Sequence, residues 1–248
     1  CGHERPGINR SSLCLWYGQV RKNQNPRFLQ GERGFFYAQK VMSSRNKEYT
    51  QDIIQLQNTN HQSIINRKAV WNMKLKGKSV VVTGASSGMG KAIVERFAKE
   101  GANIIAVARR KERLDELAAS LKEAPGKVVP FVGDVSKEET MVSAIDLAVK
   151  EFGRLDVLVN NAGIMDDMSP IGDVKNEKID QVFAVNVYGP MYSMRKAVQV
   201  FLEQGDGGNI INVASFGAIR TAAGAVYGAS KAALVSLTKN TAYMYMPN

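Results

Sequence analysis

Two residues near the end of the chain, Tyr227 and Lys231, have the types and the spacing of an acid–base pair. Residues at i and i+4 share one face of a helix, so the phenol and the ammonium are expected side by side. A cation held next to a phenol favours its ionised form, and such a Tyr can exchange a proton near neutral pH. The pattern therefore predicts general acid–base catalysis by Tyr227.

A second pair, Tyr192 and Lys196, has the same spacing. We interpret it as an aromatic residue and a surface ion on a long helix. Tyr227 is preferred because a predicted strand ends at Ser215, shortly before it, and that hydroxyl can reach the same substrate oxygen. The alternative for Ser215 is an end-of-strand hydroxyl bonded to its own backbone.

A glycine-rich turn, Thr83-Gly-Ala-Ser-Ser-Gly-Met-Gly90, joins the first predicted strand to the first helix. Glycine permits positive φ and lets the backbone approach a ligand closely. The free N–H groups of the following helix favour a phosphate. The turn is therefore predicted to bind the pyrophosphate of a dinucleotide, and the alternative is a tight turn without a ligand.

From Met73 onward the sequence contains neither Cys nor His. This excludes a disulfide framework, a Cys/His zinc site and a Ser-His-Asp triad from that part of the chain, and no metal site is expected. No apolar run is long enough to span a membrane. Without disulfides or a recognisable signal peptide, the chain is expected in the cytoplasm.

Strand and helix patterns alternate after residue 78. Strands are expected at 79–83, 103–107, 127–132, 156–159 and 209–213, and helices at 91–100, 111–122, 136–152, 177–202 and 224–246. A capping box at 136–139 is expected to open the third helix. Apolar strands separated by helices indicate βαβ units and a doubly wound parallel sheet, which makes this an α/β protein.

Residues 1–72 differ from the rest in composition. They hold 11 Lys/Arg, 4 Asp/Glu and 16 Asn/Gln, and they show no sustained periodicity. We expect a disordered or non-native N-terminal extension before a domain at 73–248. The alternative, a basic arm that binds nucleic acid, is the weaker interpretation.

Several motifs occur in a fixed order along residues 73–248. They are Thr83-Gly84-x-x-x-Gly88-x-Gly90, Asp134-Val135, Asn160-Asn161-Ala162-Gly163, Asn186, Ser215 and Tyr227-x-x-x-Lys231. In this combination the chain resembles the single-domain branch of the short-chain dehydrogenase/reductase family. The resemblance implies a Rossmann-like sheet with strand order 3-2-1-4-5, and a dimer or tetramer of the full-length protein.

Two features depart from the family pattern. Ser215 and Tyr227 are one residue closer in sequence than is usual. The chain also stops at Asn248, at the end of the Tyr/Lys helix, so the family's last two strands are expected to be missing. We therefore expect the 248 residues alone to be inactive and prone to aggregate through the bare edge of strand 209–213.

The resemblance also implies residue roles. Catalysis is assigned to Asn186, Ser215, Tyr227 and Lys231, with Asn186 holding a water that relays protons to Lys231. Cofactor binding is assigned to Gly84, Ser86, Ser87, Gly88, Met89, Gly90, Arg109, Asp134, Val135, Asn161, Ala162, Gly163, Tyr227 and Lys231. Two alternatives stay open: Asn186 satisfies a buried carbonyl, and Asp134 caps a helix.

The cofactor is expected to be NADP, with NAD as the alternative. An NAD-specific site places an acidic residue at the end of the second strand, where this chain has Ala108 followed by Arg109 and Arg110. Arginine suits a 2′-phosphate. The predicted function is hydride transfer between NADP and a secondary alcohol or ketone, as in 3-oxoacyl reductases or sugar and steroid alcohol dehydrogenases. The alternative is a non-catalytic nucleotide-binding fragment.

Overall fold

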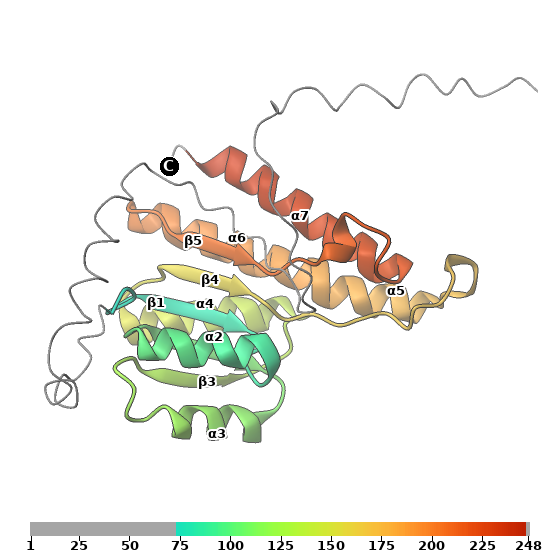
Figure 1. Cartoon of the computed structure of the whole chain (residues 1–248). Coiled ribbons are helices and arrows are strands. Elements are labelled where there is room, and N and C mark those ends of the chain that lie inside the picture. Colours follow the sequence, from blue (N-terminus) through green and yellow to red (C-terminus); the bar gives the residue numbers. More distant parts are fainter. Residues whose placement is uncertain (1–72, 247–248) are drawn as a thin grey trace, which may run out of the picture. The chain divides into compact units, whose positions relative to one another are not determined.

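The computed structural model describes residues 73–246, and the expected extension at 1–72 lies outside this range. Within it, five strands form one parallel sheet in the order β3-β2-β1-β4-β5. Figure 1 shows the sheet with β3 at the bottom of the view and β5 at the top. The predicted fold class and strand order are confirmed.

The strands match the apolar runs of the sequence. They are β1 (Ser79–Thr83), β2 (Asn103–Ala108), β3 (Val128–Val132), β4 (Val157–Asn160) and β5 (Asn209–Asn212). Central β1 is buried along its whole length, whereas Ile211 on edge strand β5 is 44% exposed. Helices cover both faces of the sheet, and for this reason its central strand is apolar on both sides.

The helices are α2 (Gly88–Lys99), α3 (Lys111–Ser120), α4 (Glu138–Phe152), α5 (Asn176–Phe183), α6 (Gly189–Gln204) and α7 (Ala225–Tyr245). Short helical turns are η2 (Ile171–Asp173), η3 (Ala184–Tyr188) and η4 (Phe216–Ala218). No helix among residues 73–246 is long and apolar enough to cross a membrane.

Two hydrophobic clusters lie on opposite faces of the sheet. On one face, Val80 and Val82 pack with Val94 of α2 and Leu114 of α3. On the other, alternate strand residues pack against α4 and α6, and Leu237 of α7 joins this cluster. Successive side chains of a strand point to opposite faces of the sheet. A single apolar run therefore contributes to both hydrophobic clusters, and these clusters hold in place the sheet from which the loops of the site extend.

The predicted helix at 177–202 is instead three helical segments in succession. Between α5 and α6 the backbone makes one π-helical stretch, η3, which contains Asn186. Pro190 follows this stretch, and proline cannot donate the i→i−4 hydrogen bond that an α-helix would direct to the Asn186 carbonyl. Periodicity found the helices, but it did not reveal the wider turn.

The predicted capping box at 136–139 is wrong. Helix α4 begins at Glu138, its N-cap is Lys137, and no side chain caps it. The Ser136 hydroxyl instead donates to Asp134 Oδ1 at 2.9 Å. A capping box needs its serine at the N-cap, where the hydroxyl oxygen accepts from the helix. Because α4 begins at Glu138, Ser136 stands one residue before the N-cap and cannot fill that role.

Candidate active site

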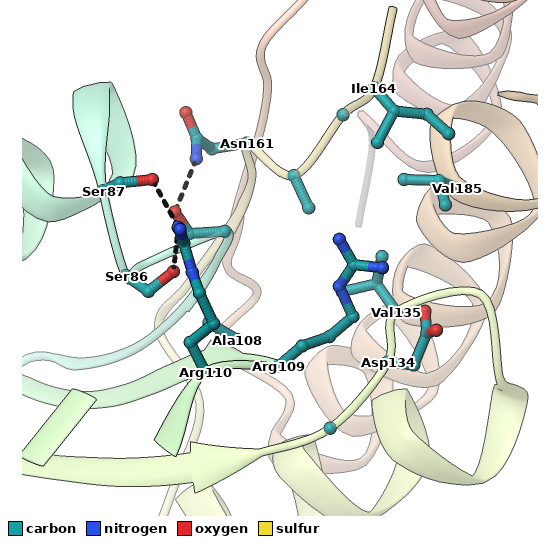
Figure 2. Close-up of a pocket in the computed structure, with 14 residues that line it drawn as sticks. Ser86, Ser87, Ala108, Arg109, Arg110, Asp134, Val135, Asn161, Ile164 and Val185 are labelled. Atoms are coloured by element: carbon teal, nitrogen blue, oxygen red, sulfur yellow. Dashed lines mark hydrogen bonds between the residues drawn. The ribbon is translucent and has the colours of Figure 1, made fainter. Parts of the chain in front are cut away.

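A pocket of about 480 Å³ opens at the carboxyl ends of the central strands (Figure 2). It is lined by Gly84, Ser86, Ser87, Ala108, Arg109, Arg110, Gly133, Asp134, Val135, Asn161, Ala162, Gly163, Ile164 and Val185. In doubly wound sheets this edge is where ligands bind. Twelve of these fourteen residues lie in the segments that follow β1, β2, β3 and β4, so their place in the topology accounts for their gathering.

Glycines of the turn are required for close packing. A Cβ on Gly84 would lie 2.8 Å from Asn161 Nδ2, and its φ of +68° is left-handed. A Cβ on Gly90 would lie 2.2 Å from the Gly84 carbonyl oxygen. A Cβ on Gly88, whose φ is +55°, would meet no atom of another segment within 4 Å. The turn thus packs tightly on the loop after β4 and leaves room on its outer side.

Thr83 joins the glycine turn to the loop after β4. Its Oγ1 accepts hydrogen bonds from Asn161 N at 3.0 Å and Ala162 N at 3.1 Å, and donates to Val159 O at 3.3 Å. The Asn161 side chain returns a bond to Thr83 O at 2.9 Å. Thr83 therefore fixes two walls of the pocket, a role that the sequence analysis did not assign.

The two arginines after β2 differ in their contacts. Arg110 donates to Ser86 Oγ at 3.0 Å and to Ser87 Oγ at 2.9 Å, whereas Arg109 extends into the pocket (Figure 2). Sequence reasoning assigned Arg109 alone to the cofactor. The signal for Arg110 was its position next to Arg109, beyond the end of the same strand.

Asp134 lies in the opposite wall of the pocket. Partial burial raises the pKa of its carboxyl, but hydrogen bonds from Ser136 and the charge of Arg109 outweigh burial and hold that pKa below its usual value. The bonds from Ser136 N and Oγ are 3.0 and 2.9 Å long. Asp134 is therefore an anionic acceptor fixed by its own loop, beside nearly buried Val135.

Five predicted cofactor residues do not line this pocket: Gly88, Met89 and Gly90 of the glycine turn, and Tyr227 and Lys231 of α7. Gly88 lies in a shallow neighbouring hollow with Lys91 and Arg113. Met89 is 47% exposed, and Gly90 is buried against Gly84. Their assignment to the cofactor stays a prediction.

Helix α7 carries Tyr227 and Lys231. The Lys231 ammonium lies 5.9 Å from the centroid of the Tyr227 ring, and it donates to Val213 O at 2.8 Å. The side chain is almost fully buried, and burial lowers the pKa of Lys231 to about 8. A Cβ on Gly163 would lie 3.3 Å from Lys231 Nζ, so the lysine lies directly behind the pocket wall.

Asn186 connects η3 to the pocket wall and to α7. Its Oδ1 accepts from Ile164 N at 2.9 Å, and its Nδ2 donates to Ile164 O at 2.9 Å and to Ser230 Oγ at 3.0 Å. Asn186 is fully buried. The contact agrees with the alternative interpretation that it satisfies a buried carbonyl.

Ser215 is the N-cap residue of η4, in the loop after β5. Its Oγ accepts from Gly217 N at 3.1 Å, as the alternative interpretation expected. The hydroxyl proton stays available to a further acceptor. η4 packs on α7, where a Cβ on Gly228 would lie 3.1 Å from Gly217 O. The shorter Ser215–Tyr227 spacing is thus accommodated by a compact loop.

The second Tyr/Lys pair has other partners. Lys196 Nζ forms an ion pair with Asp146 Oδ1 at 2.7 Å, and Arg195 lies 5.8 Å from the Tyr192 ring centroid. None of the four residues of the two pairs lines the pocket at the strand ends. Tyr192 and Lys196 are both half-buried on α6, and Tyr192 packs against a core cluster, so the interpretation of this pair as a surface ion and an aromatic residue stays a prediction.

Comparison with known proteins identifies the family. Residues 78–248 match the model of the short chain dehydrogenases. The chain is 43% identical over 175 residues to 3beta-hydroxysteroid dehydrogenase 2 of Eggerthella lenta, covering 70% of this chain and 67% of that one. It is 39% identical over 171 residues to the 3-oxoacyl-(acyl-carrier-protein) reductase of Thermotoga maritima, covering 68% and 69%.

A solved structure also resembles the fold of this chain. The 3-ketoacyl-(acyl-carrier-protein) reductase of Brucella melitensis, complexed with NADH, superposes with a TM-score of 0.65 at 37% identity, covering 69% of this chain and 71% of that one. The chain therefore spans about two thirds of the length of the relatives it matches. With its sheet order, its pocket at the strand ends and these relatives, the chain belongs to the short chain dehydrogenase family of oxidoreductases, which act on CH–OH groups with NAD(P).

Proposed function

We propose that this protein is an NADP-dependent oxidoreductase that transfers a hydride between the nicotinamide and a small secondary alcohol or ketone. The observation that carries the choice of cofactor is the pair of arginines at the end of β2. Arg109 extends into the pocket, Arg110 lies against the glycine turn, and the strand ends in Ala108 where an NAD site would hold an acid.

The pocket fits a dinucleotide in its other features. The glycine turn opens α2, so its N–H groups and the helix dipole favour the pyrophosphate. The Asp134 carboxylate would accept from the adenine amino group, with Val135 N–H beside it. A 2′-phosphate would lie between Arg109 and Arg110, where guanidinium groups can bind it with two parallel hydrogen bonds.

When bound, the nicotinamide supplies or accepts the hydride. The chain's own residues move the proton. Tyr227 donates its phenolic proton to the carbonyl oxygen, or takes it back from the alcohol. The Ser215 hydroxyl, whose proton is available, holds and polarises that oxygen.

Lys231, one helical turn after Tyr227 on α7, supports this proton transfer. Its positive charge stabilises negative charge on the Tyr227 oxygen, and it would bind the nicotinamide ribose across Gly163. Its present acceptor, Val213 O at 2.8 Å, fixes the side chain in this position. Asn186 holds the loop at Ile164 and would complete the relay to Lys231 through a water.

Binding measurements test the choice of cofactor. We expect the Kd for NADPH to be lower than that for NADH, and Arg109→Ala to remove most of the difference. A hydrogen bond to a charged group contributes about 1.5–3 kcal/mol, or roughly ten- to 150-fold in Kd. Arg113→Ala, in the neighbouring hollow, is the matched control. Equal affinities for both cofactors in the unmodified chain would contradict the proposal.

A ketone panel tests the reaction. The names of the relatives suggest a 3-oxoacyl thioester, a 3-ketosteroid and a sugar ketone as first substrates. Ketone-dependent loss of NADPH absorbance supports the oxidoreductase. Binding of NADPH without turnover of any ketone would favour the non-catalytic alternative. The expected oligomer and the expected cytoplasmic location stay predictions.

A further inference from the structure

We propose that Asp166, in the loop between β4 and α5, is a positioning residue that sets the orientation of Tyr227; this rests on the proposed function. Asp166 Oδ2 accepts a hydrogen bond from the backbone N–H of Tyr227 at 2.8 Å. The two residues are 61 positions apart in the sequence. The backbone of the proposed acid–base residue is thus held by a side chain from another loop of the site.

The first turn of α7 needs such an acceptor. The N-cap residue is Gly224, which has no side chain, and the turn contains no acidic residue. An N-cap side chain usually accepts from the third N–H of its helix, and Tyr227 is the third residue of α7. Asp166 makes that bond from outside the helix, and its negative charge suits the helix N-terminus.

The Asp166 carboxylate occupies the space next to Gly224. A Cβ on Gly224 would lie 2.1 Å from Asp166 Oδ1 and 2.3 Å from Oδ2. The backbone φ of Gly224 is −60°, a value that any residue adopts. A side chain at position 224 would therefore displace the Asp166 carboxylate, although the backbone conformation there suits any residue.

The loop that carries Asp166 is fixed on both sides of it. Asn186 binds the backbone of Ile164, and Asp166 Oδ1 also accepts from Met168 N at 3.3 Å. Met168 adopts a left-handed φ of 62°, which is uncommon for a non-glycine residue. Asp166 thereby transmits a defined loop conformation to the start of α7.

Activity measurements test the proposal in a protein that also carries the family's last two strands, because the 248 residues alone are expected to be inactive. With Asp166→Ala we expect kcat for ketone reduction to fall about 100-fold, since a misplacement of about 1 Å can cost that much. The Kd for NADPH should not change, because Asp166 does not line the cofactor pocket. Asp166→Asn keeps an acceptor oxygen and should restore most of the rate.

Asp167→Ala is the matched control. Asp167 accepts from Ser169 N at 3.3 Å in the same kind of local turn, but it is exposed and has no bond to α7 among the described contacts. We expect normal kcat for it. Normal kcat in Asp166→Ala, or a parallel loss of NADPH affinity, would overturn the proposal.

A double-substitution cycle separates positioning from general stability. Gly224→Ala alone should impair kcat as Asp166→Ala does, because the new methyl group displaces the carboxylate. Combined with Asp166→Ala, the same substitution should cost little more, because the colliding atoms are gone. Losses in kcat that multiply independently would show that Gly224 and Asp166 do not act through one contact.

Hydrogen exchange at the Tyr227 amide tests the contact with Asp166 without any measurement of turnover. Exchange should be faster in Asp166→Ala and unchanged in Asp167→Ala. If the unmodified protein that carries the family's last two strands reduces no ketone with NADPH, the proposed function fails. If Tyr227 exchange is unchanged in Asp166→Ala, the Asp166 proposal is overturned whatever the activity.

Discussion

The side-chain amide of Asn186 binds both polar backbone groups of one residue, Ile164. It accepts from the N–H and donates to the carbonyl, each at 2.9 Å. Asn186 lies in the π-helical stretch and is fully buried. The residue that the family resemblance assigned to a proton relay is thus also the anchor of the loop after β4.

Replacing Asn186 by Ala should destabilise the fold. The substitution leaves the N–H and carbonyl of Ile164 without their partner. An unsatisfied buried group costs about 1–3 kcal/mol, and because Ile164 is half-buried we expect a loss toward the lower end of that range. Urea unfolding of the two proteins gives the difference. Asn240→Ala is the control, because Asn240 is exposed and bonds within its own helix. Equal stabilities of the two variants would contradict this account of Asn186.

Tyr227→Phe should abolish turnover and leave NADPH binding nearly unchanged. The phenylalanine has no proton to give, and general acid–base catalysis is typically worth about 10²–10⁴-fold. Steady-state NADPH oxidation with a ketone and fluorescence titration with NADPH measure the two effects. Tyr192→Phe is the matched variant. Loss of activity in Tyr192→Phe but not in Tyr227→Phe would mean that the other pair is catalytic.

Lys231 should give the fold an unusual dependence on alkaline pH. Its pKa is lowered from 10.5 to about 8 by burial, so between these values the unfolded chain binds more protons than the folded chain. The free energy of unfolding therefore rises with pH across this window. Below about pH 8 the buried ammonium costs roughly 3 kcal/mol, at about 1.36 kcal/mol for each pKa unit.

Lys231→Met should remove this rise. Urea unfolding between about pH 7 and pH 11 compares it with the unmodified chain and with Lys239→Met, an exposed lysine on the same helix. We expect the slope of stability against pH to fall by up to about 1.4 kcal/mol per pH unit in Lys231→Met alone. Identical slopes in all three proteins would rule out the buried ammonium as the cause.

Thr83→Val should weaken both the fold and the cofactor site. Valine has nearly the shape of threonine but leaves the N–H groups of Asn161 and Ala162 without their acceptor. Each lost bond is worth about 1 kcal/mol, and the freed loop should also raise the Kd for NADPH. Thr221→Val, at an exposed position, is the control. An unchanged Kd with reduced stability would limit Thr83 to a structural role.

The sequence by itself determined the sheet, its order and much of the pocket. Apolar runs such as 79–83 and the helices between them specify parallel βαβ units, whose right-handed connections leave few topologies. The family motifs added the order 3-2-1-4-5. Residues that follow a strand directly, such as Arg109 and Asp134, must then gather at one edge of the sheet. Local pattern and chain connectivity were sufficient for the parallel sheet, whereas the strand order came from the family resemblance.

Only the tertiary structure decided which side chains meet. Asp166 meets Tyr227 across 61 residues, and Arg110 meets Ser86 across 24, because loops from different strands converge at the sheet edge. The capping box failed because α4 begins at Glu138, one residue later than the box required, so that Lys137 and not Ser136 is the N-cap. A hydrogen bond forms with the best acceptor within about 3 Å in space, and sequence spacing does not give that distance once the chain has left its own helix or turn.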